Sequence, residues 1–201
     1  MDIGAIISSP TRDPEWVRKC VITGLFALIP IAGQLNLLGW TKAAYQRAKT
    51  GDPMLPEPSL EYIGSGWALF LAILPAYLVL FGWSILVSVL GAMDLRAAAL
   101  VGNLISFVLN LAISLVLVPA LTYRHVTHGK GFADAFDVAD ISRIVTTNSG
   151  AFVSFALVAF LSNLIGGLGV VACCLGVILS LPFSAAVNAT NIDAFERQTG
   201  L

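Results

Sequence analysis

The chain has 201 residues, of which 57% are hydrophobic and only 11% are charged. Because soluble domains carry about 25% charged residues, this composition excludes a soluble domain of any size beside the apolar segments. The net charge of −1 and the lack of a basic stripe in the sequence exclude a nucleic-acid partner.

Uncharged runs alternate with four patches of Lys and Arg, which is the pattern of a polytopic membrane protein. Apart from Arg96, every basic residue can lie on one side of the membrane, and short loops rich in Lys and Arg stay cytoplasmic. We therefore expect an all-α transmembrane helical bundle in the cell inner membrane, with both termini cytoplasmic. The whole chain, 1–201, is expected to form a single integral membrane domain with four full spans and a short broken or re-entrant N-terminal hairpin.

The N-terminal part is expected to contain a cytoplasmic interfacial segment, 1–19, and then a broken helical hairpin, 20–50. Pro30 and Gly33 interrupt the apolar run of this hairpin. Since basic residues flank both ends of the run, a hairpin that dips into the membrane and returns is favoured over a single span. Two further polar residues follow the break: Gln34 and Asn36.

A full helical hairpin is expected over 66–119. About 20 apolar residues cross a membrane, and this segment holds two such spans, 66–90 and 98–119, joined by a short turn. The next segment, 131–145, is expected to form a cytoplasmic surface helix. Its polar face is acidic, whereas helices that bind lipid surfaces are basic, so it is expected to pack on the hairpin ends or on a partner.

The last apolar run, 149–192, is too long for one span and is expected to form another hairpin. Glycines at 166, 167 and 169 suggest a turn between helices over 149–165 and 170–191. Aromatic residues near the predicted helix ends are candidates for anchors at the headgroup level: Trp16, Trp40, Tyr45 and Tyr123.

Three units end alike, with an aromatic residue, then an Arg one or two positions later, then Thr or His before a glycine. The closing glycines are Gly51, Gly129 and Gly200. An even number of predicted crossings separates them, so the three ends should lie on the same face of the membrane. The similarity is explained either by convergent helix ends, since glycine often ends a helix, or by three repeated helical hairpins.

Two predicted helices carry uncharged polar residues at helical spacing. The first face consists of Asn103, Ser106, Asn110 and Ser114. The second face consists of Ser180, Ser184, Asn188 and Asn191. Such faces suit either packing between helices, where a polar contact contributes about 0.6 kcal/mol, or a water-filled path. Packing is favoured because every helical bundle needs such contacts.

The sequence offers little for catalysis or metal binding. No predicted span contains Asp, Glu, Lys, Arg or His, which argues against proton-coupled transport. His125 and His128 supply two ligands where a structural metal site takes four. Cys20, Cys173 and Cys174 have no disulfide or zinc spacing and are interpreted as apolar packing residues. We therefore predict no catalytic residue, no cofactor and no metal.

Short motifs follow one another in a set order over nearly the whole chain. They are Trp16 with Lys19, Pro30-Ile31-Ala32-Gly33, Gly39-Trp40, Gly51, Leu55-Pro56-Glu57 and Asp134-Ala135-Phe136-Asp137. This arrangement resembles the membrane protein family called domain of unknown function 4013. The family usually has Gly-Tyr in place of Gly39-Trp40, and an aromatic residue soon after Leu-Pro, where this chain has Pro58.

The resemblance implies a membrane protein and transfers no activity, cofactor or catalytic residue. The chain is also similar, more weakly, to the membrane domains that accompany glycerophosphodiester phosphodiesterases, although the sequence has no phosphodiesterase domain. We expect a non-catalytic membrane component, a scaffold or accessory subunit, with membrane lipids and a second copy or another membrane protein as partners. The alternative is a passive channel or carrier for a small or lipidic solute. An enzyme is disfavoured because the predicted spans lack Asp, Glu, Lys, Arg and His.

Overall fold

The computed structural model describes residues 2–171 and 175–200, and this part of the chain contains helices and no strand. In chain order the elements are α1 (Ile3–Ile7), η1 (Ser9–Arg12), α2 (Trp16–Ala27), α3 (Ala32–Lys49), α4 (Ile63–Ala92), α5 (Arg96–Ala112), the π-helical η2 (Ile113–Leu117), α6 (Val118–His128), η3 (Ala133–Phe136), α7 (Val138–Thr147), α8 (Ser149–Val171) and α9 (Leu175–Thr199). Three helical stretches are long and apolar enough to cross a membrane: Ile63–Ala92, Arg96–His128 and Ser149–Gly169.

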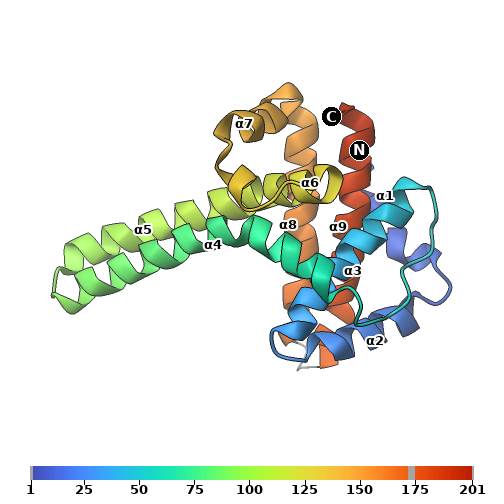
Figure 1. Cartoon of the computed structure of the whole chain (residues 1–201). Coiled ribbons are helices and arrows are strands. Elements are labelled where there is room, and N and C mark those ends of the chain that lie inside the picture. Colours follow the sequence, from blue (N-terminus) through green and yellow to red (C-terminus); the bar gives the residue numbers. More distant parts are fainter. Residues whose placement is uncertain (1, 172–174, 201) are drawn as a thin grey trace.

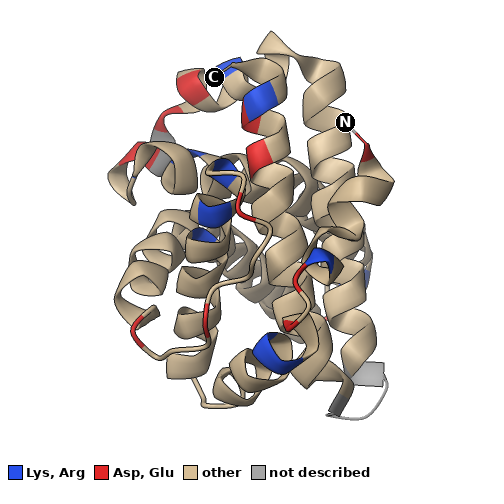
Figure 2. Ribbon diagram, turned by 90° about the vertical axis from the view of Figure 1, so that its right-hand side faces the viewer, with Lys and Arg blue, Asp and Glu red and all other residues tan. Residues whose placement is uncertain are grey.

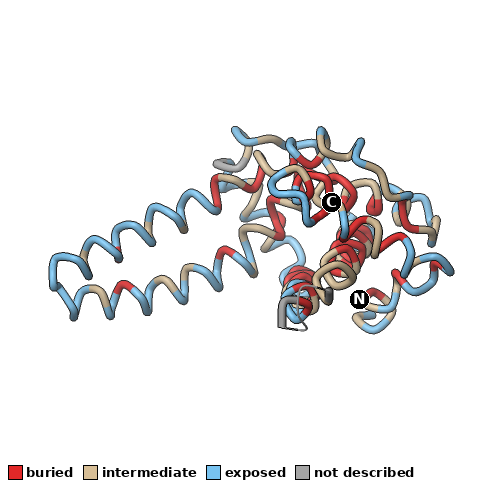
Figure 3. The backbone as a smooth tube through the Cα atoms, turned by 90° about the horizontal axis from the view of Figure 1, so that it is seen from below, coloured by how far each residue is buried: buried red, intermediate tan, exposed pale blue. Residues whose placement is uncertain are grey.

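The helices form a body and an arm (Figure 1). The body is built on α8 and α9, which pack side by side, with α2 and α3 against α9. The arm consists of α4 and α5, which leave the body together and run across the direction of α8 and α9 (Figures 1 and 3). Figure 3 shows that buried residues concentrate in the body, whereas the arm is mostly exposed.

The predicted break in the first hairpin is present, because α2 ends at Ala27 and α3 begins at Ala32. A Cβ on Gly33 would lie 2.1 Å from the carbonyl oxygen of Phe26, so only glycine permits this close return of the chain. Gln34 Nε2 donates to the carbonyl of Ala27 at 3.0 Å across the break. Ile31, at the tip, is 75% exposed and has a φ of 63°, a strained value for a β-branched residue.

Three helices that close the hairpins end in glycines with left-handed backbone conformations. The φ angles are 77° at Gly51, 68° at Gly129 and 66° at Gly200. Because glycine has no Cβ, it adopts this conformation at little cost and ends a helix there. The three similar endings in the sequence therefore share one backbone conformation, a left-handed glycine after the last helical residue.

The same three helix ends meet at one end of the body. The Tyr123 ring lies 5.1 Å from the Phe195 ring, centroid to centroid, in an edge-on arrangement. The Tyr45 hydroxyl donates to a carboxylate oxygen of Glu196 at 2.5 Å. Helix ends that are far apart in the sequence, 151 positions for Tyr45 and Glu196, thus form one contact region, beside which both termini lie (Figure 1).

The arm is held together by close packing of its two helices. A Cβ on Gly102 would lie 2.9 Å from a methyl carbon of Val87, so the glycine sets the distance between α5 and α4. At the tip, Arg96 and Asp94 form an ion pair of 2.9 Å whose side chains are 86% and 81% exposed. The arm therefore has an apolar shaft and a charged tip.

The helical structure that contains the predicted second span, 98–119, continues past Pro119 to His128 and ends at the predicted closing glycine, Gly129. Pro119 lies in the first turn of α6, directly after the π-helical turn Ile113–Leu117. Proline lacks an N–H donor and clashes with the preceding turn of an α-helix. The wider π-helical turn accommodates this change in the hydrogen-bond ladder.

The predicted turn at residues 166–169 is wrong, because α8 continues to Val171. Gly169 serves close packing instead: a Cβ there would lie 2.0 Å from the Ser180 hydroxyl oxygen and 2.7 Å from backbone atoms of Gly176, whereas a Cβ on Gly167 would meet nothing within 4 Å. Small residues let two helices approach closely within a membrane. Cys173 and Cys174 lie outside the described residues, whereas Cys20 is buried as predicted.

The predicted surface helix over 131–145 is divided into η3 and α7. The division occurs at Asp137, whose carboxylate accepts a hydrogen bond from the Asp140 N–H at 3.1 Å and caps α7. An Asp side chain that binds the backbone in this way starts a new helix rather than continuing the previous one. Ile144 of α7 is buried, so this helix packs on the hairpin ends, as expected.

Candidate functional site

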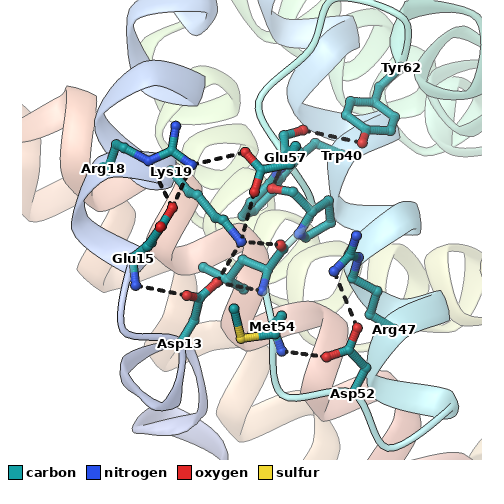
Figure 4. A network of polar contacts seen from close by, with 12 residues as sticks. Asp13, Glu15, Arg18, Lys19, Trp40, Arg47, Asp52, Met54, Glu57 and Tyr62 are labelled. Atoms are coloured by element: carbon teal, nitrogen blue, oxygen red, sulfur yellow. Dashed lines mark hydrogen bonds and ion pairs between the residues drawn. The ribbon is translucent and has the colours of Figure 1, made fainter.

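An ion pair buried in the N-terminal part connects three segments of the chain (Figure 4). Lys19 Nζ lies 2.9 Å from Asp13 Oδ2 and 3.2 Å from Glu57 Oε1. It also donates to the carbonyl of Leu55 at 2.9 Å. The side chains of Lys19 and Asp13 are 3% and 0% exposed. The pair therefore fixes the start of α2 to the proline-rich loop that follows α3.

Hydrogen bonding keeps both members of this pair charged. Burial raises the pKa of Asp13, but hydrogen bonds from the N–H groups of Glu15 and Leu55 and from Lys19 outweigh it, so that the pKa is lowered overall. Burial likewise lowers the pKa of Lys19, but its bonds to Asp13 and Glu57 outweigh burial and raise that pKa overall. At neutral pH the two side chains therefore form a charged pair that joins the start of α2 to the loop after α3.

The aromatic residues predicted as interface anchors are mostly interior. Trp40, Tyr45 and Tyr123 are 0%, 3% and 0% exposed, which corrects the prediction that their rings lie among headgroups. Trp40 Nε1 donates to the carbonyl of Pro56 at 3.2 Å and so fastens the same proline-rich loop. Trp16 is half-buried and packs edge-on against Phe183 with ring centroids 5.7 Å apart.

A second buried cation organises the segment after α6. Arg124 is 1% exposed, its Nε lies 2.8 Å from Asp140 Oδ2, and its Nη1 donates to the carbonyl of Asp134 at 2.7 Å. His125 beside it is buried, and its Nδ1 lies 2.7 Å from the carbonyl of Lys130. Among the described residues, no three His, Cys, Asp or Glu residues are close enough to hold a metal.

Apart from Asp94 and Arg96 at the arm tip, the remaining charges lie on loops and helix ends of the body, with basic and acidic residues interleaved (Figure 2). Lys49 pairs with Glu196 at 2.8 Å, and Arg197 with Asp193 at 2.9 Å. The second of these pairs lines a hollow of about 290 Å³. These groups join the end of α3 to the end of α9, so their role is structural.

The polar face predicted on the last helix is used in packing between α8 and α9. Ser162 donates to the carbonyl of Ser184 at 2.7 Å. Ser180 donates to the carbonyl of Gly166 at 3.0 Å. Asn191 Nδ2 donates to the carbonyl of Phe155 at 2.9 Å, and its side chain is fully buried. Three of the four predicted residues on this face therefore take part in the contact between two helices.

The polar face predicted on α5 does not pack between helices of the body, and its residues on α5 lie along the arm. Ser106 accepts a hydrogen bond from Trp83 Nε1 at 2.9 Å within the arm. Asn103 and Asn110 are exposed on the outside of the arm, and Asn110 donates to its own helix at the carbonyl of Ser106. The two polar faces do not run beside each other, so they do not line one common path.

The ends of the two faces do meet at one cavity of about 240 Å³, in the angle between the arm and the body. Ser114 reaches it from η2, and Ser184 and Asn188 reach it from α9. Asn163 of α8 and Thr122 of α6 also line it. Most of the other lining side chains are apolar, and none of the described lining residues is charged.

Sequence reasoning identified three of these five polar residues and missed Asn163 and Thr122. Asn163 is the only amide side chain in the sequence of α8, which is a signal that could have been used. Asn36, predicted beside the break in the first segment, does not line the cavity. It is buried, and within the described chain neither atom of its amide has a hydrogen-bond partner.

Comparison with known proteins gives no relative for this chain. A scan against protein-family models, a search of curated proteins and a search of solved structures each found no match. The site must therefore be interpreted from its own geometry.

Proposed function

We propose that this protein is a non-catalytic component of the cell inner membrane, a scaffold or accessory subunit that assembles through its arm. The observation that supports this proposal is the apolar, exposed surface of α4 and α5. Phe81, Leu100, Leu104 and Phe107 are each more than 60% exposed. Apolar patches of this extent mark contact with a membrane or with another protein.

The arm has the length and polarity of a membrane hairpin. At about 1.5 Å per residue, the 17 residues of α5 extend about 26 Å, close to the roughly 30 Å of a hydrocarbon core. The exposed Asp94–Arg96 pair at the tip would then emerge on the far side. Four spans are proposed in total, formed by α4, by α5 with α6, by α8 and by α9, with both termini cytoplasmic.

Four parallel spans require the arm to turn where it joins the body, since it runs across α8 and α9 (Figure 1). Both helical stretches of the arm contain a feature that favours bending. Pro75 lies inside α4, and the π-helical turn with Pro119 lies between α5 and α6. Proline and π-helical turns are the usual sites of helix bending.

The partner we propose is a second copy of the chain, joined through the α5 face that carries Asn103 and Asn110. In hydrocarbon an amide without a partner is costly, and both side chains are exposed on the arm. An amide carries donors and an acceptor, so the same face on two copies is self-complementary across a twofold axis. The family resemblance noted in the sequence remains part of this proposal and adds no activity to it.

Replacing both Asn103 and Asn110 should dissociate the proposed dimer. We expect the wild-type protein, extracted gently from its native membrane, to give a dimer in mass spectrometry of the intact complex. The Asn103→Leu, Asn110→Leu variant should give a monomer, with the same unfolding midpoint because both side chains are exposed. The matched control is Val101→Leu with Val108→Leu, which changes the opposite side of α5 by helical period and should leave the dimer intact.

A dimer that persists in the asparagine variant would contradict the proposed face. A wild-type complex with a different membrane protein, lost in the same variant, would replace the second copy by that partner.

Labelling of single cysteines tests the orientation. In a background without native cysteines, Met93→Cys at the arm tip should react with a membrane-impermeant maleimide only from outside the cell. Thr11→Cys, beside Arg12, should react only after the cytoplasmic face is opened, because basic loops stay inside. Both positions are exposed in the protein, so a lack of reaction reports the membrane. Reaction of Met93→Cys from the cytoplasmic side only would contradict the crossing of the arm.

A further inference from the structure

We propose that the 240 Å³ cavity at the base of the arm binds the head of a neutral acylglycerol, a lipid whose head carries hydroxyl and ester groups and no charge. The cavity is enclosed by α3, α4, α6, α8 and α9 together with η2. This inference does not depend on the assembly proposed above, because the asparagines of the α5 face do not line the cavity.

The cavity presents polar groups that the protein itself leaves unused. Ser184 is engaged with Ser162, and Thr41 donates to the carbonyl of Leu37. The side chains of five other polar lining residues make no hydrogen bond within the described part of the chain. These residues are Tyr77, Ser114, Thr122, Asn163 and Asn188.

Unpaired polar groups at membrane depth call for a ligand with matching chemistry. Ser114 and Asn163 are exposed, and Thr122 and Asn188 are half-buried; lipid chains offer such groups no hydrogen bond. Asn163 and Asn188 together provide amide donors and acceptors, and Ser114 and Thr122 provide hydroxyls that can do either. Hydroxyl and ester oxygens of a glycerol head satisfy both kinds of group.

The walls exclude a charged head and favour an acyl chain. None of the described lining residues is ionisable, apart from the phenol of Tyr77. A carboxylate or phosphate would therefore enter without a counter-charge, which is expensive in a site of low polarity. Leu69, Ile73, Phe155 and Ile192 supply apolar surface beside the polar groups.

The size and position of the cavity indicate that it holds only part of a lipid. Pockets that enclose a whole drug-sized ligand have about 300–1,000 Å³, and this cavity is smaller. Its exposed members are Tyr77, Ser114 and Asn163, so the mouth lies between α4, η2 and α8. Stretches Ile63–Ala92 and Ser149–Gly169 on either side are apolar enough to cross a membrane. The rest of the acyl chain can thus remain in the hydrocarbon.

Photolabelling tests this site with a defined probe. Purified protein in dodecyl maltoside would be incubated with a monoacylglycerol that carries a diazirine in its acyl chain, irradiated, and mapped by peptide mass spectrometry. We expect labels on peptides of α4, α8 and α9 that line the cavity, and their loss with excess unlabelled monoacylglycerol. The free fatty acid of the same chain length, ionised at pH 8, should not compete.

Two variants connect the labels to the cavity. Asn188→Leu removes one amide at nearly constant volume, and the loss of its hydrogen bonds should weaken binding about tenfold. Ala159→Phe fills the cavity and should abolish labelling there. Ser88→Leu, which replaces another polar side chain by leucine on the exposed surface of α4 away from the cavity, is the control and should leave labelling unchanged.

Labels spread along the exposed arm and insensitive to Asn188→Leu would overturn the proposal. If the fatty acid competes as well as the monoacylglycerol, the proposal that the cavity selects an uncharged head is wrong. If Ala159→Phe does not fold, the comparison of Asn188→Leu with Ser88→Leu still decides between the two outcomes.

Discussion

Replacing Lys19 by methionine should lower the free energy of unfolding by about 3–5 kcal/mol, the usual cost of removing one partner from a buried ion pair. The reason is that the Asp13 carboxylate, which is 0% exposed, would keep its charge without a cation beside it. Its two backbone donors, the N–H groups of Glu15 and Leu55, would remain. The measurement is a denaturant titration of the protein in detergent micelles.

Two controls separate this effect from a general loss of charge. Arg18→Met removes a cation whose side chain is 52% exposed and which pairs with Glu15 and Glu57 at the surface; exposed pairs contribute about 0–1 kcal/mol. The double variant Asp13→Asn, Lys19→Met removes both charges and should recover much of the stability. If Lys19→Met and Arg18→Met lower the free energy of unfolding by the same amount, the buried pair does not stabilise the fold more than the surface pairs do.

The same pair determines how stability depends on pH. The pKa of Asp13 is lowered in the folded state below its ordinary value of 3.8. Its contribution is therefore fully present above that ordinary value and is lost as the pH falls through the lower, folded-state pKa. In Lys19→Met, one cause of the lowering is absent, so the loss of stability as the pH falls below 3.8 should be smaller than in the wild type.

Gly66→Ala should destabilise the protein by about 1–3 kcal/mol or more, as overpacking at a rigid contact does. A Cβ at this position would lie 1.6 Å from the carbonyl oxygen of Leu35. From the other side, a Cβ on Gly39 would lie 1.9 Å from the carbonyl oxygen of Tyr62. The obstructing atoms belong to the backbone, so α3 and α4 would have to separate.

Gly64→Ala is the matched control for this change, made two residues earlier in the same helix. A Cβ on Gly64 would meet nothing within 4 Å. Since alanine favours a helix over glycine by up to about 1 kcal/mol, this variant should be unchanged or slightly more stable in the same denaturant titration. If Gly64→Ala and Gly66→Ala lower the stability by similar amounts, Gly66 is not required for the close crossing of α3 and α4.

The sequence predicted neither the burial of Lys19 nor the helix contact made by the glycines of α8, and the physical reasons differ. Lys19 appears in the sequence as one of a basic patch beside an apolar run, which predicts an exposed cytoplasmic charge. It is buried because the loop containing Leu55 and Glu57 folds back over it. The glycines of α8 looked like a turn because a turn and a close helix contact both require a residue without a Cβ.

The sequence by itself determined that this chain is helical, that it contains apolar helices of membrane-spanning length, and that its first apolar run breaks near Pro30. These features depend on hydrophobicity and on local backbone restrictions, which act within a few residues. Only the tertiary structure decided that Trp40 and Tyr123 are interior, that the α5 asparagines face outward, and that Asn163 and Asn188 line one cavity. Those properties depend on contacts between distant segments, and the spacing of residues within one helix does not specify which other helix will cover it.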